Sequence, residues 1–154
     1  MTLDEFIYTQ SLTAVLCKNK ANFSVRLYFS NITDILQEEM DFFPNIKQVF
    51  AREVLLCLNE TPVVAARSIC MPEDKYWLEI LNCGNKSLGA RLFDGKTNWQ
   101  RSDFKIHNNY SLLEKRFDLP KEYITTRTSL FDHQTHRLLL AECFLPTLKS
   151  FGFE

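Results

Sequence analysis

The sequence predicts an α+β fold in which a single six-stranded, mainly antiparallel sheet carries helices on one side. Two pairs of apolar runs each flank a short polar stretch, which is the pattern of a β-hairpin. The regular alternation of strands and long helices that a parallel sheet requires is missing. With 154 residues and 45% hydrophobic content, the chain can bury one substantial core. We therefore expect residues 1–154 to form a single domain.

The first half of the chain opens with helical sequence and continues into strands. We expect a helical segment through residues 2–19, with Ser11 as an N-cap, because serine side chains accept hydrogen bonds at helix starts. The alternation in "NFSVRLYFS" predicts a half-buried strand, and "ITDILQEEM" suggests a short helix. The runs "REVLLCL" and "VVAARSICM" then flank "NETP", which predicts the first hairpin.

The second half ends in a second hairpin. Residues 72–93 are expected to hold a short helix over the sheet, and "WQRSDFKIH" predicts a weaker strand. Residues 108–122 suggest a mobile helical connection. The runs "YITTRTSLF" and "RLLLAECFL" flank "DHQTH", which predicts the last two strands and their turn.

Charge and composition exclude several classes of partner. The formal net charge is -1, and no lysine and arginine run is dense enough for a nucleic-acid-binding surface. No apolar run reaches the roughly 18 to 20 residues of a membrane span, and the acidic start "MTLDEF" is unlike a secretory signal. We expect a soluble, monomeric protein that is not exported and binds neither nucleic acid nor membrane.

Cysteines and histidines do not predict a metal site. The five cysteines lie in apolar surroundings without a CxxC pair, so we interpret them as buried residues of a reducing compartment. A free reactive thiol is the alternative. His133 and His136 lie in the polar "DHQTH" stretch without a second cluster of ligands, which favours a turn over a metal centre.

One carboxylate stands in an otherwise apolar run. In "LLLAECFLP", strand geometry places Glu142 on the same face as Leu138, Leu140 and Phe144. An ionised carboxylate on such a face is costly unless it is paired, hydrogen-bonded or open to a ligand cavity. Glu142 therefore requires a partner.

The expected register of the two hairpins offers two candidate environments for the Glu142 carboxylate. If Phe131 opposes Leu138, Arg127 lies across from Glu142, and a cross-strand ion pair satisfies the carboxylate. If Leu58 opposes Val63 in the first hairpin, Arg52 and Arg67 fall on one face, although a slip of one residue would separate them. Arg52, Arg67 and Glu142 would then line one cavity, in which two guanidinium groups grip a substrate with two carboxylates.

The chain contains, in this order, the three blocks "REVLLCLNETPVVAARSICMP", "SLGARLF" and "LLLAECFLP". Together these blocks resemble the chorismate lyase family, whose members make 4-hydroxybenzoate. The similarity runs from Ser11 to the end of the chain and is clearest after Arg52. The family also includes plastid-encoded homologues of red algae, and the Asn, Lys, Phe and Ile content suits an AT-rich genome. The resemblance implies the plastid stroma as location, with the bacterial cytoplasm as the alternative.

The resemblance also implies roles for individual residues. Arg52 would clamp the ring carboxylate, Arg67 would reach the second carboxylate or the exit route, and Glu142 would face the ring hydroxyl. Leu88 would supply a backbone contact, and Leu12 falls where the family has an apolar residue that touches the ligand. Arg127 falls in an element that reads Trp-x-Arg-Arg-Ser in the family. This chain has "TTRTS" there, with Thr126 in place of the first arginine.

The implied reaction is the elimination of pyruvate from chorismate, with no metal or cofactor. The ring becomes aromatic when the enolpyruvyl ether and one hydrogen leave, so the protein has to position the substrate and neutralise charge. Glu142 would either take the ring proton or orient the hydroxyl. We expect helical lid segments, residues 71–86 and 108–122, to roof the cavity and exclude water.

The alternative is a ligand-binding module without turnover. Effector-sensing domains of some bacterial transcription regulators resemble this fold and bind small molecules. Such sensors normally carry a DNA-binding domain, for which this chain has no room, and this favours the enzyme.

Overall fold

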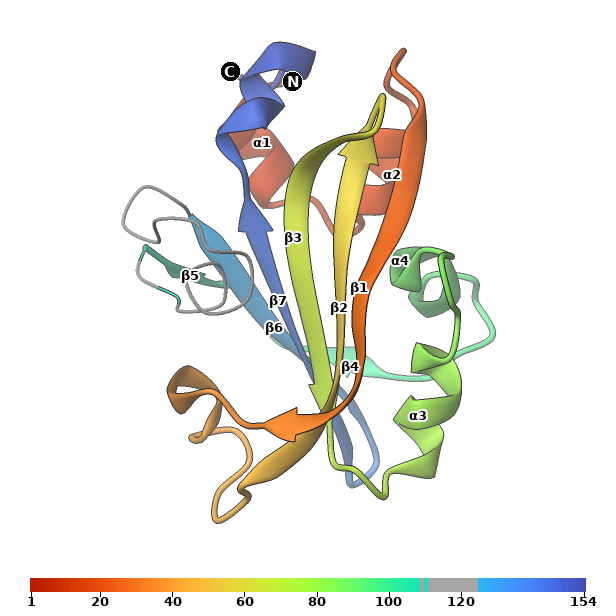
Figure 1. Cartoon of the computed structure of the whole chain (residues 1–154), viewed down its shortest axis with the longest axis vertical. Helices are drawn as coiled ribbons and strands as arrows, with labels where there is room; N and C mark the ends of the chain where they lie inside the picture. Colours follow the sequence, from red (N-terminus) through yellow and green to blue (C-terminus); the bar gives the residue numbers. More distant parts are fainter. Residues whose placement is uncertain (109, 111–124) are drawn as a thin grey trace.

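The computed structural model, which describes residues 1–108, 110 and 125–154, is built around one antiparallel sheet (Figure 1). The strand order is β1-β2-β3-β7-β6-β4, and β5 also pairs with β6. The strands are β1 (Phe23–Asp34), β2 (Gln48–Leu58), β3 (Thr61–Cys70), β4 (Gln100–Arg101), β5 (Lys105–His107), β6 (Thr126–His133) and β7 (His136–Phe144). The helices are α1 (Leu3–Ile7), α2 (Leu12–Cys17), α3 (Lys75–Leu81), α4 (Leu88–Leu92) and the 3-10 turns η1 (Gln37–Glu39) and η4 (Pro146–Phe151).

The predicted α+β class with an antiparallel sheet is confirmed, but the described sheet has seven strands and not six. The difference lies in the stretch that was expected to form one weak strand, which forms β4 and β5 instead. Ser102 interrupts it, because the Leu130 backbone N–H donates to the Ser102 hydroxyl at 2.8 Å rather than to a ladder carbonyl. Both short strands still pair with β6.

The helical segments are shorter than expected because each has its own N-cap. Ser11 accepts a hydrogen bond from the Ala14 N–H, so it starts α2 and divides the expected opening helix into two. Asp74 and Ser87 cap α3 and α4 in the same way, which gives two helices where one was expected. The expected helix near residue 36 is wrong in its first part, since β1 continues to Asp34 and only the turn η1 follows.

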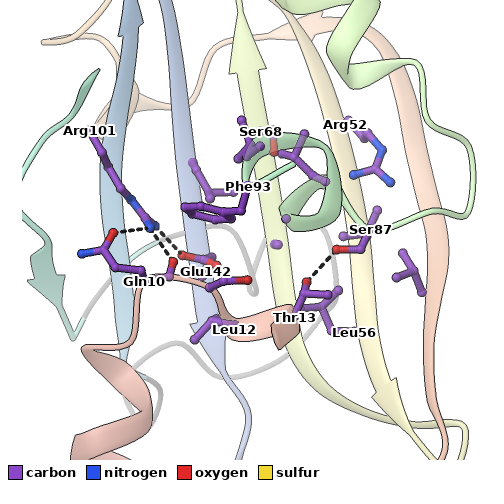
Figure 2. A pocket seen from close by; sticks show the side chains of 18 residues that line it. Gln10, Leu12, Thr13, Arg52, Leu56, Ser68, Ser87, Phe93, Arg101 and Glu142 are labelled. Carbon is purple, nitrogen blue, oxygen red and sulfur yellow. Dashed lines mark hydrogen bonds and ion pairs between the residues drawn. The ribbon is translucent and has the colours of Figure 1, made fainter. Parts of the chain in front are cut away.

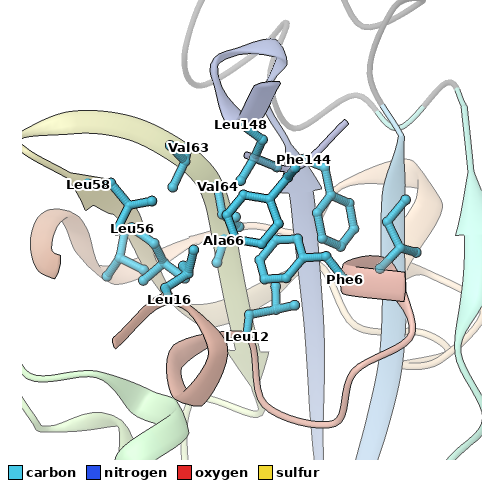
Figure 3. Close-up of a cluster of buried hydrophobic side chains, with 13 residues drawn as sticks. Phe6, Leu12, Leu16, Leu56, Leu58, Val63, Val64, Ala66, Phe144 and Leu148 are labelled. Atoms are coloured by element: carbon cyan, nitrogen blue, oxygen red, sulfur yellow. The ribbon is translucent and has the colours of Figure 1, made fainter. Parts of the chain in front are cut away.

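Strand alternation divides the core between the two faces of the sheet. On β7, Leu138 and Leu140 pack with residues of α3 and α4, and Phe144 packs with residues of α1 and α2. Leu139 packs on the opposite face with Ile35 and Phe43. The four α-helices therefore cover one face, as predicted, and the turn after β1 covers part of the other (Figures 1 and 3).

The first hairpin forms where the sequence predicted it, but the predicted register is wrong by one residue. Asn59 and Glu60 have φ values of 48° and 65°, so the turn has two residues and not four. A bulge then leaves Val63 without an opposing residue, and Arg52 pairs with Ser68 instead of Ile69. Since a slip of one residue reverses a side chain's face, Arg67 lies on the opposite face from Arg52.

The second hairpin has the predicted register throughout. Phe131 pairs with Leu138, and Arg127 pairs with Glu142. His133 and His136 close the strands around a two-residue turn, which confirms that "DHQTH" is the hairpin loop.

Burial supports the interpretation of most cysteines as core residues. Cys17 is exposed, whereas the other four thiols are buried, and all five are free. Burial raises the pKa of the Cys70 and Cys143 thiols to about 12, so both are protonated at neutral pH. In the described ranges, no helix combines the length and the hydropathy needed to cross a bilayer.

Candidate active site

A pocket lies between the helix-covered face of the sheet and helices α2 and α4 (Figure 2). Its floor comes from three central strands and includes Arg52, Val54, Leu56, Ala66, Ser68, Leu140 and Glu142. Its roof includes Gln10, Leu12, Thr13, Ser87, Leu88, Leu92 and Phe93. The cavity volume is about 40 Å³, well below the roughly 150 Å³ of an apolar cavity that admits benzene. A ligand with a six-membered ring must therefore push lining side chains apart.

Arg52 is a buried cation at one end of the pocket. Its side chain is held by the loop before α4, because Nη2 donates to the carbonyls of Gly84 at 3.0 Å and Lys86 at 2.7 Å. Its Nε atom is buried and makes no hydrogen bond. Within the described part of the chain, its guanidinium takes part in no ion pair, and burial lowers the pKa of Arg52. A buried guanidinium held by carbonyls has the charge and the free donor that could bind an anion.

Glu142 lies at the other end of the pocket and is paired to Arg127. The Arg127 Nε donates to Glu142 Oε1 at 2.7 Å, which confirms the cross-strand pair expected from the register. Arg127 does not line the pocket. Its Nη1 donates to the carbonyls of Ile7 and Thr9, at 2.6 and 2.5 Å. Arg127 thereby fixes both Glu142 and the connection between α1 and α2.

A second pocket-lining arginine, Arg101, was not expected from the sequence. It lies on β4, with its Nη2 atom 3.7 Å from Glu142 Oε1. Its guanidinium stacks over the rings of Phe104 and Phe131, at 4.5 and 4.6 Å. Burial lowers the pKa of Arg101 to about 10, with Glu142 opposing this shift. Arg101 is therefore still protonated at neutral pH.

Arg67 lies on the other face of the sheet, away from the pocket. It forms a two-pronged ion pair with Glu39, at 2.8 and 2.9 Å, and a third contact with Glu53 at 2.6 Å. All three side chains are at most 1% exposed. Burial opposes the charge of Arg67, but the hydrogen bonds and charges of Glu39 and Glu53 outweigh it and raise the pKa. The expectation that Arg52 and Arg67 share one cavity is therefore wrong, for the reason of register given above.

The comparison with protein families decides the membership of this chain. The family described as chorismate lyase matches residues 2–152, which is nearly the whole sequence. The chain belongs to the chorismate lyase family.

Individual relatives in the chorismate lyase family come from bacteria. A probable chorismate pyruvate-lyase of Nitrosomonas eutropha is 31% identical over 153 residues, covering 92% of this chain and 85% of the relative. One from Idiomarina loihiensis is also 31% identical and covers 92% of this chain and 77% of the relative. These relatives do not support the expected plastid location.

Solved structures of low identity share the fold of this chorismate lyase family member. The C-terminal domain of the histidine utilization repressor from Pseudomonas syringae pv. tomato has a TM-score of 0.57 at 7% identity, covering 82% of this chain and 93% of that one. The effector domain of PhnF from Mycobacterium smegmatis has a TM-score of 0.53 at 8% identity, covering 81% and 82%. At such identities the likeness concerns the fold alone.

The other residues implied by the chorismate lyase resemblance also reach the pocket. Leu12, at the start of α2, and Leu88, at the start of α4, both line it. The roof differs from the expected lids. It comes from α2 and α4, and the loop after α3 contributes the carbonyls that hold Arg52. The other expected lid, residues 108–122, lies largely outside the described residues.

Two features of this chorismate lyase pocket escaped the sequence reasoning. Arg101 belongs to a strand of two residues, too short to show an alternation pattern. The roof is fastened by a hydrogen bond of 2.6 Å between the hydroxyls of Thr13 and Ser87, which lie 74 positions apart. The Ser-Leu-Gly pattern did give one local signal, since serine before an apolar turn marks a helix start.

Proposed function

We propose that this protein is a chorismate pyruvate-lyase that converts chorismate to 4-hydroxybenzoate and pyruvate. The observation that carries the proposal is the placement of two groups at opposite ends of one pocket: Arg52, a buried cation with no acid partner among the described residues, and Glu142. A para-substituted ring with a carboxylate at one end and a hydroxyl at the other matches these two groups. Membership of the chorismate lyase family supports the same assignment.

Arg52 is proposed to bind the ring carboxylate. Its unpartnered Nε and the rest of its fork can donate to carboxylate oxygens, while the carbonyls of Gly84 and Lys86 keep the side chain in place. Because the guanidinium is already held and already out of water, little reorganisation is needed when the anion arrives. The lining leucines and Phe93 would cover the faces of the ring.

Glu142 is proposed to act on the opposite edge of the ring. Its contacts with Arg127 and Arg101 both use Oε1, so Oε2 is the oxygen that a ligand would meet. Oε2 would either take the proton from the hydroxyl-bearing carbon or accept a hydrogen bond from the hydroxyl. The fixed Arg127 pair would hold the carboxylate in position during this step. In this proposal, the side chains of Arg52 and Glu142 carry out binding and proton transfer.

Turnover of chorismate by the purified protein tests this proposal. We expect 4-hydroxybenzoate and pyruvate to appear together in equal amounts, measured by absorbance and by a coupled lactate dehydrogenase assay. Binding of 4-hydroxybenzoate without any pyruvate from chorismate would reject the enzyme and favour the ligand-binding module.

A Glu142→Gln variant tests the role of the carboxylate. The amide oxygen can still accept from Arg127 Nε, so the change removes the base and its charge but keeps the shape. We expect turnover to fall by about 100-fold or more, the usual contribution of a general base, with a much smaller effect on the melting temperature.

The matched control is Asp132→Asn, which removes an acid from the same hairpin outside the pocket. Asp132 pairs with Arg137 at 2.9 Å, and both side chains are about 40% exposed. This variant should turn over chorismate like the wild type. If unfolding accounts for the whole loss in Glu142→Gln, the carboxylate is a structural ion-pair partner.

A further inference from the structure

Arg101 is held by hydrogen bonds and by ring stacking, but its contact with Glu142 is long. Its distance to Glu142 Oε1 is 3.7 Å, against 2.7 Å for Arg127 on the same oxygen, so Arg127 already satisfies that carboxylate. Its other partners are a serine hydroxyl, Ser129, and the carbonyl and side-chain oxygens of Gln10. The Gln10 amide contact, at 3.3 Å, is long and neutral, and a carboxylate oxygen would exchange for it readily.

Charge is out of balance at this end of the pocket. Arg101 and Arg127 carry two positive charges, and among the residues that the structure describes Glu142 carries the one negative charge that faces them. Arg52, at the other end, adds a further cation. Among the lining residues the cations are Arg52 and Arg101, and the one acid is Glu142, which Arg127 pairs from outside the lining at 2.7 Å. Since Arg127 compensates the charge of Glu142, Arg52 and Arg101 remain as two pocket cations, one for each carboxylate of a dianion.

The substitution pattern of chorismate places its second carboxylate near Arg101. The ring carboxylate and the hydroxyl lie para to each other, and the enolpyruvyl ether is attached to the carbon next to the hydroxyl. If the ring carboxylate lies at Arg52 and the hydroxyl at Glu142, the ether must project from the Glu142 end. Figure 2 shows Arg101 at that end, with its guanidinium directed toward Glu142 and Gln10.

We infer that Arg101 is the receptor for the enolpyruvyl carboxylate, which is one of the two roles that the resemblance implied for Arg67, the other being the exit route. The inference rests on the proposed function, because it takes the orientation of the ring from Arg52 and Glu142. Arg101 would exchange its Gln10 side-chain contact for the carboxylate and keep its stacking on Phe104 and Phe131. The position of this arginine would make the site selective for a dicarboxylate.

The same contact would assist the departure of pyruvate. The hydrogen on the hydroxyl-bearing carbon leaves as a proton, and its electron pair completes the aromatic ring. The neighbouring carbon–oxygen bond breaks, and its electron pair goes to the ether oxygen, which leaves as the enolate of pyruvate. That enolate takes one proton on its methylene carbon to become pyruvate. A guanidinium on the departing group stabilises the charge that develops there.

Two stable aromatic probes separate this role from a structural one. Both are 4-hydroxybenzoates with an ether next to the hydroxyl: the 3-carboxymethoxy compound carries a second carboxylate, and the 3-methoxy compound, vanillate, does not. Calorimetry on the wild-type protein should show about tenfold or more tighter binding of the 3-carboxymethoxy compound, the worth of a charge-assisted hydrogen bond. Arg101→Met keeps an apolar stem between the phenylalanine rings and should abolish this preference, while vanillate affinity changes by less than about threefold.

The matched control is Arg137→Gln. It removes one positive charge from the chain, as Arg101→Met does, but from an exposed side chain outside the pocket. It should leave the preference for the dicarboxylate at the wild-type value. An unchanged preference in Arg101→Met would overturn the inference, and so would equal loss of affinity for both probes. If Arg101→Met does not fold, a crystal structure of the wild type with the 3-carboxymethoxy compound decides. The second carboxylate at Arg101 supports the inference, and any other position overturns it.

Failure of the proposed function is distinguishable from failure of this inference. Without pyruvate formation by the wild type, the protein is not a lyase, yet the two probes still report whether Arg101 selects a second carboxylate. With normal turnover, the Arg101→Met variant should lose chorismate affinity and turnover together, because the contact is made both to the bound and to the departing group.

Discussion

Two buried arginines of the central hairpin, Arg52 and Arg67, have opposite relations to charge. Arg67 is paired to Glu39 and Glu53 on one face of the sheet, whereas Arg52 donates to carbonyls on the other and has no acid partner in the described part of the chain. A buried cation that already has two acid partners is stabilised little by a further anion, whereas a buried cation without an acid partner is stabilised much more. Burial alone therefore does not distinguish these two arginines, and their hydrogen-bond partners do.

Replacing Arg67 tests this difference. In Arg67→Met, Glu39 and Glu53 remain buried without their cation, and we expect a loss of about 3 to 5 kcal/mol in the free energy of unfolding. Affinity for 4-hydroxybenzoate should stay at the wild-type value under conditions in which the variant is folded. Urea denaturation and calorimetry measure the two quantities.

A compensated variant provides the control for Arg67. With Glu39→Gln and Glu53→Gln added to Arg67→Met, the stranded charges disappear, and much of the stability should return. If Arg67→Met instead loses affinity for 4-hydroxybenzoate without losing stability, Arg67 acts in binding.

At the scale of elements, the two hairpins show what sequence reasoning can reach. Applied to the second hairpin, the pairing of Phe131 with Leu138 gave the ion pair of Arg127 and Glu142 correctly, because no bulge interrupts β6 and β7. In the first hairpin, the register predicted from the sequence is wrong. The turn has two residues and a bulge occurs at Val63, and together these shift the pairing by one residue. Apolar side chains cover both faces of these central strands, so the hydrophobic pattern did not reveal the slip.

The contact between α2 and α4 controls the roof of the pocket and can be tested at one glycine. A Cβ atom at Gly89 would lie 2.9 Å from the Thr13 hydroxyl oxygen, which is already bonded to Ser87. Gly89→Ala should therefore displace α4 and weaken 4-hydroxybenzoate binding by about tenfold, an overpacking effect. Calorimetry at a temperature well below the melting transition measures this loss.

Removing the obstructing hydroxyl supplies the control for Gly89. The double variant Gly89→Ala with Thr13→Ala removes the 2.9 Å contact and leaves the milder one of 3.2 Å with the Cβ atom of residue 13. It should therefore bind 4-hydroxybenzoate more tightly than Gly89→Ala alone. Wild-type affinity in the single variant, or no recovery in the double variant, would show that this helix contact does not set the shape of the pocket.

At the scale of the whole molecule, the sheet separates two polar clusters, one on each face. One face holds the buried ion pairs of Arg67, which tie η1 to β2 and β3. The other face holds Arg52, Arg101 and Glu142, which come from three different strands and meet only in the folded chain. The sequence predicted the fold class, the helix-covered face and two of these three residues. The position of Arg101 in the pocket depends on how a short edge strand packs, and no local sequence pattern predicts that packing.

The orientation of 4-hydroxybenzoate in its complex with the protein tests this account most directly. A crystal structure of the complex should show the carboxylate within hydrogen-bonding distance of the Arg52 guanidinium and the hydroxyl at Glu142, with α2 and α4 moved apart to admit the ring. A ligand bound in the reverse direction, or bound beside Arg67 on the opposite face of the sheet, would contradict it.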